Sequence, residues 1–319
     1  MPAKTEFKMG VATRVAFGDT LLELARKDER IVVCDADISK STMTHKFHQE
    51  FPERFFSCGI AEANMVSIGA GLAAAGKIAF VSSFSCFVLN KGFEQLRVSV
   101  AYPGIKNFVV VGTHSGISIG EDGPSQMSIE DLALTCSLPG FSVLAPADEV
   151  AMRKLVAVAA YNGPVFLRAG RVKTAIVHDE ETEFKIGGSV RMRDGSDVTI
   201  MAFGMMVAEA VRASEMLAGD GISARVIDLY SIKPLDRDVI AKAAAETGAV
   251  VVAEEHLVDG GLGVRVAQVV GETAPAVMEF VGIRNTYAES GTPYGLLEKY
   301  GLTADKIAAA ARQAIRRKQ

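Results

Sequence analysis

One short segment gathers several residue types that can do acid–base chemistry or bind polar ligands. Residues 113–124 have the sequence THSGISIGEDGP, with His114 near the start and the adjacent carboxylates Glu121 and Asp122 near the end. The glycines allow backbone conformations closed to other residues, so the segment can bring polar groups close to a small ligand. A glycine-rich crossover turn after the apolar run at 107–112 explains the glycines equally well.

A second candidate is Glu62, which opens an apolar segment rich in glycine and alanine at 63–76. A glutamate in the first turn of a helix is stabilised by the helix dipole, and this alone explains its presence without a chemical role. A helix this apolar is expected to be buried, however, and a buried carboxylate can hold or pass a proton near neutral pH. Two aromatic residues, Phe84 and Phe87, lie close together at the end of the next predicted strand. Taken alone, such rings are typical of a protein core.

Size and composition limit the class of protein. The chain has 319 residues, which is long for one hydrophobic core and favours two domains. Its formal net charge is −4 with both signs interspersed, so nucleic acid is not expected as a partner. The N-terminus has no apolar stretch typical of a signal peptide, and the most apolar run, 65–76, is short and broken by glycines. We therefore expect a cytoplasmic protein with no membrane or nucleic-acid partner.

Patterns that suggest metal or nucleotide sites are incomplete. The four cysteines are dispersed, with no CxxC motif and no histidine at metal-ligand spacing, so neither a disulfide nor structural zinc is expected. The glycines at 260–263 do not have the GxGxxG spacing of a dinucleotide site. The GDG at 219–221 lacks the later asparagine of a magnesium and diphosphate motif, and a helix end explains it. No metal ligands are predicted in this chain.

Runs of β-branched residues alternate with helical periodicity, the pattern of parallel sheets whose strands are joined by helices. The predicted strands of the first half are 31–36, 78–83, 108–112, 142–145 and 165–168, and its predicted helices are 13–27, 63–75, 91–101, 129–136 and 148–161. The acidic stretch HDEETEF at 178–184 is expected to be a solvated linker. Beyond it, strands are predicted at 197–203, 225–230, 250–253 and 277–283, and a last helix at 303–316.

These patterns predict the α/β class, with two parallel-sheet α/β domains. We expect the first domain at 1–178, a linker at 179–188 and the second domain at 189–319.

Four sequence blocks, taken together, resemble one family. The blocks SCGIAEANMVSIGAGLAAAG, SSFSCF, THSGISIGEDGPSQMSIEDLA and GIRNTYAESGTPYGLLEKYGL occur in this order and are similar to the C-terminal subunit of a split transketolase. The resemblance covers nearly the whole chain and implies a thiamine diphosphate pyrimidine-binding domain followed by a transketolase C-terminal domain. The family's diphosphate-binding domain has no counterpart in the sequence. Half of the cofactor site, including the ligands of Mg²⁺, is therefore expected on an N-terminal transketolase subunit, in an α2β2 heterotetramer.

The resemblance gives cofactor-binding roles to four residues. Glu62 matches the catalytic glutamate that hydrogen-bonds a ring nitrogen of the aminopyrimidine and so promotes loss of the thiazolium C2 proton. Phe87 matches the ring that stacks on the aminopyrimidine, with Phe84 beside it in the same pocket. Asp37, in the segment ADISKS, completes the expected cofactor-binding set.

Further residues resemble the family's substrate site. The expected substrate-binding residues are Arg14, Ser41, His114, Asp122, Gln126 and Arg168. Two guanidiniums suit a phosphate group, and a hydroxyl and an imidazole add directional hydrogen bonds. Structural roles remain open at four of these positions. The alternatives are a solvated helix charge for Arg14, a helix N-cap for Ser41, a turn residue for His114 and an ion-pair partner for Arg168. Asp122 matches the aspartate that recognises a hydroxyl beside the donor's carbonyl.

One position departs from the family pattern. Gln126 stands where the family usually has a histidine that contacts the two-carbon fragment. An amide can donate and accept hydrogen bonds but cannot exchange a proton as an imidazole does. We therefore expect a donor preference other than xylulose 5-phosphate alone.

The implied activity is transfer of a two-carbon ketol unit from a ketose phosphate to an aldose or aldose phosphate, only in the presence of the N-terminal subunit. Three alternatives stay open. A 2-oxo acid dehydrogenase beta subunit shares the two-domain plan, although the GEDGP loop and the ESGTP segment argue against it. Deoxyxylulose phosphate synthase is normally one long chain. A non-enzymatic paralogue would be expected to have lost Glu62, Phe87 or Asp122, which this chain retains.

Overall fold

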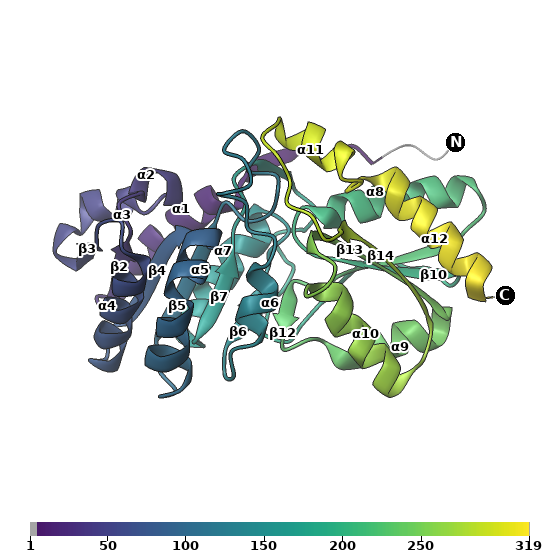
Figure 1. Ribbon diagram of the computed structural model, residues 1–319. Helices are drawn as coiled ribbons and strands as arrows, with labels where there is room; N and C mark the ends of the chain where they lie inside the picture. Colours follow the sequence, from purple (N-terminus) through teal and green to yellow (C-terminus); the bar gives the residue numbers. More distant parts are fainter. Residues whose placement is uncertain (1–4, 319) are drawn as a thin grey trace.

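Two sheets lie side by side, each covered by helices on both faces (Figure 1). The structure is a computed structural model that describes residues 5–318. The α/β class and the two predominantly parallel sheets predicted from the sequence are confirmed. A separate two-stranded pair joins β1 (Met9–Ala12) to β8 (Lys173–Ala175).

The first sheet has seven strands in the order β12-β6-β7-β5-β4-β2-β3. They are β12 (Ser231–Lys233), β6 (Ser142–Leu144), β7 (Val165–Arg168), β5 (Phe108–Thr113), β4 (Ile78–Phe84), β2 (Ile31–Asp35) and β3 (Phe55–Ser57). All neighbouring strands pair in parallel except β12 with β6. The carboxyl ends of six strands therefore lie along one edge, which is where open parallel sheets bind ligands.

Helices cover both faces of this sheet, which explains why its strands are continuously apolar rather than alternating. The helices of this part are α1 (Thr13–Ala25), α2 (Ser39–Thr42), α3 (His45–Glu50), η1 (Pro52–Arg54), α4 (Glu62–Ala74), α5 (Ser85–Gln95), η2 (Leu96–Ala101), α6 (Asp131–Cys136) and α7 (Glu149–Tyr161). Helices α1 and α7 share one core with the sheet, and α4 and α5 share another.

The second sheet has five strands in the order β14-β13-β10-β11-β9. They are β14 (Val277–Ile283), β13 (Ala249–Leu257), β10 (Val198–Ala202), β11 (Ala224–Asp228) and β9 (Val190–Arg193), and only β9 is antiparallel to its neighbour. Helices α8 (Met206–Gly219) and α12 (Ala304–Lys318) cover one face, and α9 (Arg237–Thr247) and α10 (Leu262–Thr273) cover the other (Figure 1). Helix α11 (Pro293–Lys299) lies near the junction with the first part.

Three predicted elements differ from the observed ones. The helix predicted at 91–101 begins earlier, as α5 at Ser85, and its end is the π-helix η2, because the apolar run after Phe84 packs onto the sheet as a helix. Phe87 therefore lies on a helix rather than at a strand end. The helix predicted at 129–136 is shorter, and the strand predicted at 225–230 ends at Asp228, after which β12 joins the first sheet.

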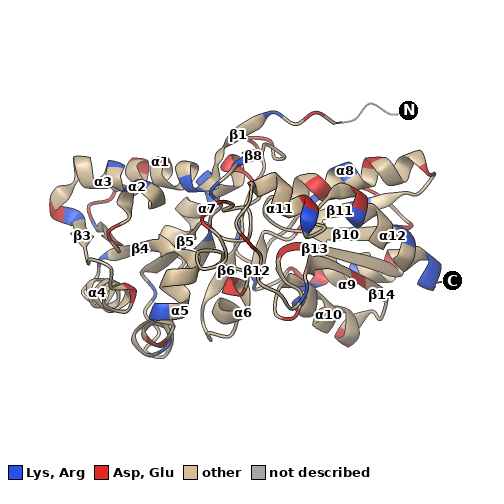
Figure 2. Cartoon of the chain, turned by 45° about the horizontal axis from the view of Figure 1, so that its top comes forward, with Lys and Arg blue, Asp and Glu red and all other residues tan. Residues whose placement is uncertain are grey.

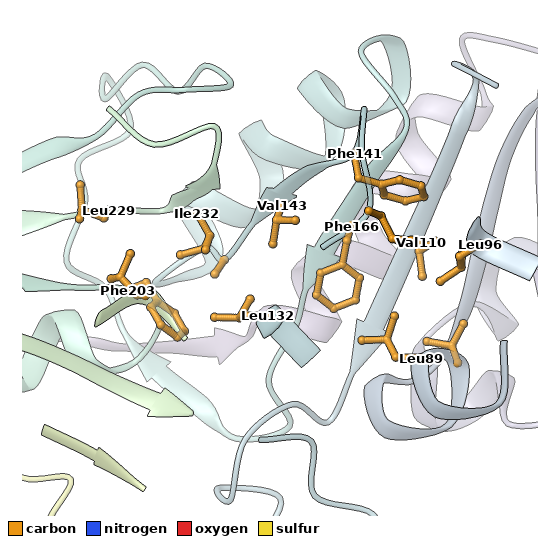
Figure 3. Packing of buried hydrophobic residues seen from close by; sticks show 14 of the residues in the cluster. Leu89, Leu96, Val110, Leu132, Phe141, Val143, Phe166, Phe203, Leu229 and Ile232 are labelled. Carbon is orange, nitrogen blue, oxygen red and sulfur yellow. The ribbon is translucent and has the colours of Figure 1, made fainter. Parts of the chain in front are cut away.

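The junction between the two sheets is packed. One cluster of buried apolar residues runs from the first sheet through α6 and β12 to Phe203 in the second part (Figure 3). In the stretch predicted as a solvated linker, residues 179–181 are exposed, but Phe184 is buried against His178 and Tyr230. The acidic residues are thus solvated as expected, whereas the aromatic residue anchors the segment.

Charged residues lie mainly on helices and connecting loops, while the strands carry few of them (Figure 2). None of the helices described between residues 5 and 318 is long and apolar enough to cross a bilayer.

Candidate active site

The candidate residues follow neighbouring strands at the carboxyl edge of the first sheet. Asp37 follows β2, Glu62 begins α4 just after β3, Phe84 ends β4, and His114 follows β5. Since β5, β4, β2 and β3 are adjacent in the sheet, these four residues are brought to one edge although they are far apart in sequence.

Glu62 and two aromatic rings form one end of the site. The Glu62 side chain is 3% exposed, and Ser83 Oγ donates a hydrogen bond to its Oε1 at 3.4 Å. The rings of Phe84 and Phe87 lie nearly parallel, 16° apart, with centroids separated by 5.4 Å. A buried carboxylate beside such rings can hydrogen-bond the nitrogen of a flat heterocycle that stacks on them.

His114 connects this end of the site to a group of arginines. Its ring stacks on Phe84 at a centroid distance of 3.9 Å, and its Nδ1 lies 2.9 Å from Thr113 Oγ1. Burial, together with the positive charges of Arg14 and Arg171, lowers the pKa of His114 to about 3. The imidazole is therefore neutral at physiological pH and acts as a hydrogen-bonding group rather than as a cation.

Arg14 and Arg171 place two positive charges next to each other. Burial and the charge of Arg171 both lower the pKa of Arg14. Arg14 Nη1 donates to the backbone oxygen of Ser41 at 2.6 Å, which brings that serine into the group. The Nε of Arg14 is buried and has no hydrogen-bond partner among residues 5–318. An anion near both guanidiniums would offset their repulsion and accept a hydrogen bond from the free Nε of Arg14.

Arg171 was not among the residues predicted for this site. Its Nη1 donates to the backbone oxygen of Ile119 at 2.6 Å and to Glu121 Oε2 at 2.8 Å, which fixes the guanidinium beside the glycine-rich loop. The signal in the sequence is the second arginine of FLRAGR, three positions after Arg168. Without coordinates, nothing distinguishes these two arginines.

Arg168 does not fit the predicted role in phosphate binding. Its guanidinium is buried, its Nε donates to Asp131 Oδ2 at 2.7 Å, and its Nη2 donates to the backbone oxygen of Glu255 at 3.0 Å. As the last residue of β7, it contacts Phe203 in the second part of the chain, and its Nε and Nη2 are already hydrogen-bonded. Arg168 is instead the ion-pair partner of Asp131, which is the structural role left open from the sequence.

The second part of the chain holds the glycine-rich loop in place. Ser118 N donates to Glu255 Oε1 at 2.6 Å, and a side chain at Gly116, whose φ is +80°, would collide with the same glutamate. Gly123 likewise has a positive φ of +81° and leaves no room for a side chain next to Ser290. The loop GEDGP and the segment ESGTP, distant in sequence, are therefore packed against each other.

Three predicted residues lie at the open side of the site. Asp37, with a φ of +65°, and Asp122 are exposed, and Asp122 is close enough to act on the charge of Arg14. Gln126 is half-buried, and its Oε1 accepts a hydrogen bond from Ser125 Oγ at 2.6 Å. Within the described residues 5–318, no group of three or more His, Cys, Asp or Glu side chains is placed to hold a metal ion.

Comparisons with known proteins identify both parts of the chain. The family model "Transketolase, pyrimidine binding domain" matches residues 9–175, and "Transketolase, C-terminal domain" matches residues 187–307. The chain is 42% identical to the 6-deoxy-6-sulfo-D-fructose transketolase subunit SqwH of Clostridium sp. (strain MSTE9), over 96% of this chain and 95% of that protein. It is 43% identical to a putative transketolase C-terminal section of Methanocaldococcus jannaschii, over 92% of this chain and 93% of the relative.

Longer relatives and a solved structure extend the comparison. Human transketolase is 39% identical over 98% of this chain, which spans only 51% of that enzyme. A solved structure described as "Split gene transketolase, inactive beta4 tetramer" superposes with a TM-score of 0.90 at 45% identity, covering 97% of this chain and all of that one.

Proposed function

The chain belongs to the transketolase family of transferases, and we propose that it is the C-terminal subunit of a cytoplasmic two-subunit transketolase that uses thiamine diphosphate. Together with an N-terminal, diphosphate-binding subunit, it transfers a two-carbon ketol unit from a ketose phosphate to an aldose acceptor. The observation that carries the proposal is the buried carboxylate of Glu62 beside Phe84 and Phe87.

The pyrimidine end of thiamine diphosphate fits the residues of this chain. Phe87 provides an aromatic face for the aminopyrimidine, and Glu62 provides the carboxyl that hydrogen-bonds its ring nitrogen, while Asp37 borders the open side. When bound, the cofactor would supply carbanion chemistry. Glu62 would hold a proton at the ring nitrogen and so orient and activate the cofactor. The diphosphate and Mg²⁺ are assigned to the partner subunit.

A phosphorylated sugar fits the arginine group. Arg14 and Arg171 provide a bidentate grip on a phosphate, and neutral His114 and Ser41 lie beside them as hydrogen-bonding groups. In this proposal, Arg171 takes the phosphate-binding role that the family resemblance implied for Arg168. Asp122 borders the same region and accepts a hydroxyl hydrogen bond from an α-hydroxy ketose, which an analogue without that hydroxyl cannot provide.

The partner subunit is expected to cover the open side of the site. Asp37 and Asp122 are exposed in this chain, and Ile60, two residues before Glu62, is 80% exposed. An apolar side chain at the entrance of a cofactor site suits burial against a second polypeptide. We propose an α2β2 heterotetramer in which each active site is shared between the two kinds of subunit.

Reconstitution tests the proposal. The purified chain is expected to be inactive, and ketol transfer from a ketose phosphate is expected on adding the N-terminal subunit, thiamine diphosphate and Mg²⁺. Replacing Glu62 by alanine should lower kcat by about 10²- to 10⁴-fold, the usual contribution of acid–base catalysis. Folding should be little affected, because a carboxylate in the first turn of a helix contributes only about 0.3 to 1 kcal/mol.

The matched control is Glu53→Ala, which removes an exposed carboxylate from the same part of the chain. It should retain full activity. Turnover by the chain without a partner, or full activity of the Glu62→Ala complex, would rule out the proposed function. Measuring CO₂ release from pyruvate separates transketolase from deoxyxylulose phosphate synthase and 2-oxo acid dehydrogenase activities.

A further inference from the structure

Lys91 contacts both groups that define the pyrimidine end of the site. Its Nζ lies 3.8 Å from Glu62 Oε2 and 4.7 Å from the centroid of the Phe87 ring. Within residues 5–318, no other cation is recorded within 4 Å of the Glu62 carboxylate. Neither the predicted site nor the roles proposed above use this lysine.

The local structure explains why Lys91 lies there. Phe87 and Lys91 are four residues apart on α5 and therefore lie on the same face of the helix. Side chains on a helix point back toward its N-terminus, so the lysine extends over the phenylalanine. The next residue, Gly92, faces the backbone of Glu62 and the side chain of Val66, which allows α5 to approach the start of α4 closely.

The position of the ammonium group conflicts with that of a bound pyrimidine. One neighbour of the Phe87 ring is Phe84, nearly parallel to it, and another is the ammonium of Lys91. A heterocycle that stacks on Phe87 while hydrogen-bonding Glu62 must contact both the Phe87 ring and the Glu62 carboxylate. The Lys91 ammonium already contacts both groups, so it occupies part of the region that such a heterocycle needs.

We propose that Lys91 is a positioning residue that occupies the pyrimidine site until the cofactor binds. In the cofactor-free subunit it keeps the buried carboxylate paired and covers the Phe87 ring. Binding of the aminopyrimidine displaces the ammonium toward solvent, and the side chain, which is 54% exposed, has room to move there. This inference rests on the proposed function, because it requires that Glu62 and Phe87 hold the cofactor.

The expected consequence is weaker cofactor binding than the site could otherwise provide. Both contacts of Lys91 must be broken. Each is a weak interaction, because the lysine side chain is 54% exposed and its ammonium stays largely solvated. Removing them should tighten binding of thiamine diphosphate by roughly 3- to 10-fold. The Lys91→Arg variant keeps the charge and the ring contact and should bind nearly as the original chain does.

Calorimetric titration of thiamine diphosphate into the complex with the N-terminal subunit, in excess Mg²⁺, tests this directly. The variants are Lys91→Met, Lys91→Arg and the control Lys77→Met. Lys77 is an exposed lysine just after α4, and it forms no ion pair with the residues described between 5 and 318. Repeating Lys91→Met in a Glu62→Gln background should give a smaller gain, because the ion contact is already lost. A role in folding alone would not produce this coupling.

Unchanged or weaker cofactor binding by the Lys91→Met complex would overturn the proposal that Lys91 occupies the pyrimidine site before the cofactor binds. An equal gain in the Lys77→Met control would also overturn it, since the effect would then be one of net charge. Failure of the proposed function looks different: the unsubstituted complex would then bind no thiamine diphosphate at all. Thermal unfolding of each variant confirms that the complexes compared are folded.

Discussion

Replacing His178 by asparagine tests a buried charge cluster at the junction of the two sheets. His178 Nδ1 lies 3.1 Å from Asp148 Oδ2, and its Nε2 lies 3.2 Å from Asp228 Oδ2. Asp148 caps α7 and Asp228 ends β11, so the imidazole connects the two parts of the chain. Burial by itself lowers the pKa of His178, but the two carboxylates outweigh it and raise the pKa to about 9.

The expected size of the effect follows from this pKa. A rise from 6.5 in the unfolded chain to about 9 in the folded chain corresponds to about 3 kcal/mol of stability. Because the folded pKa is the higher one, the contribution is fully present below about pH 6.5 and is lost as the pH rises through about 9. We expect His178→Asn to be less stable by about 3 kcal/mol at pH 6, and the difference to shrink toward pH 9.

Urea unfolding at fixed protein concentration and several pH values between 6 and 9.5 measures this difference. The control is His48→Asn, which removes an exposed histidine stacked on Phe55. A free-energy difference between His178→Asn and the original chain that stays constant or grows with pH would refute the reasoning, since the imidazole would then not be charged in the folded state.

Four further predictions concern the candidate site and its surroundings. Arg171→Met should reduce kcat/KM for phosphorylated donors by roughly 10- to 100-fold, as expected for lost charge-assisted hydrogen bonds, and steady-state kinetics measures this. Arg168→Met should instead destabilise the chain by about 3 to 5 kcal/mol, because it leaves a buried carboxylate unpaired, and urea unfolding distinguishes the two arginines. Ile60→Asp should weaken association with the N-terminal subunit by more than about tenfold, as measured by sedimentation. Unimpaired assembly of this variant would show that Ile60 stays exposed in the complex. Gln126→His should raise activity with xylulose 5-phosphate relative to other ketose phosphates, and equal changes for all donors would show that this position does not select among them.

Much of the fold follows from local sequence patterns. The apolar β-branched runs at 31–36, 78–83 and 108–112 are strands because only a sheet covered on both faces buries such runs completely. The start of α4 at Glu62 likewise follows from the apolar, glycine-rich segment after it. The four motif blocks identified the family, and the comparisons confirm that identification.

The sequence by itself determined the class of fold, the family and the chemical types at the site, because these depend on short-range periodicity and on motifs. Only the tertiary structure decided that Arg171 joins Arg14 while Arg168 pairs with Asp131. It also decided that Lys91 reaches Glu62. The physical reason is that the side chains at strand and helix ends have two possible neighbours, the ligand or another part of the protein. Packing against β13 and between α4 and α5 settles which neighbour each one has, and that packing joins residues far apart in the chain.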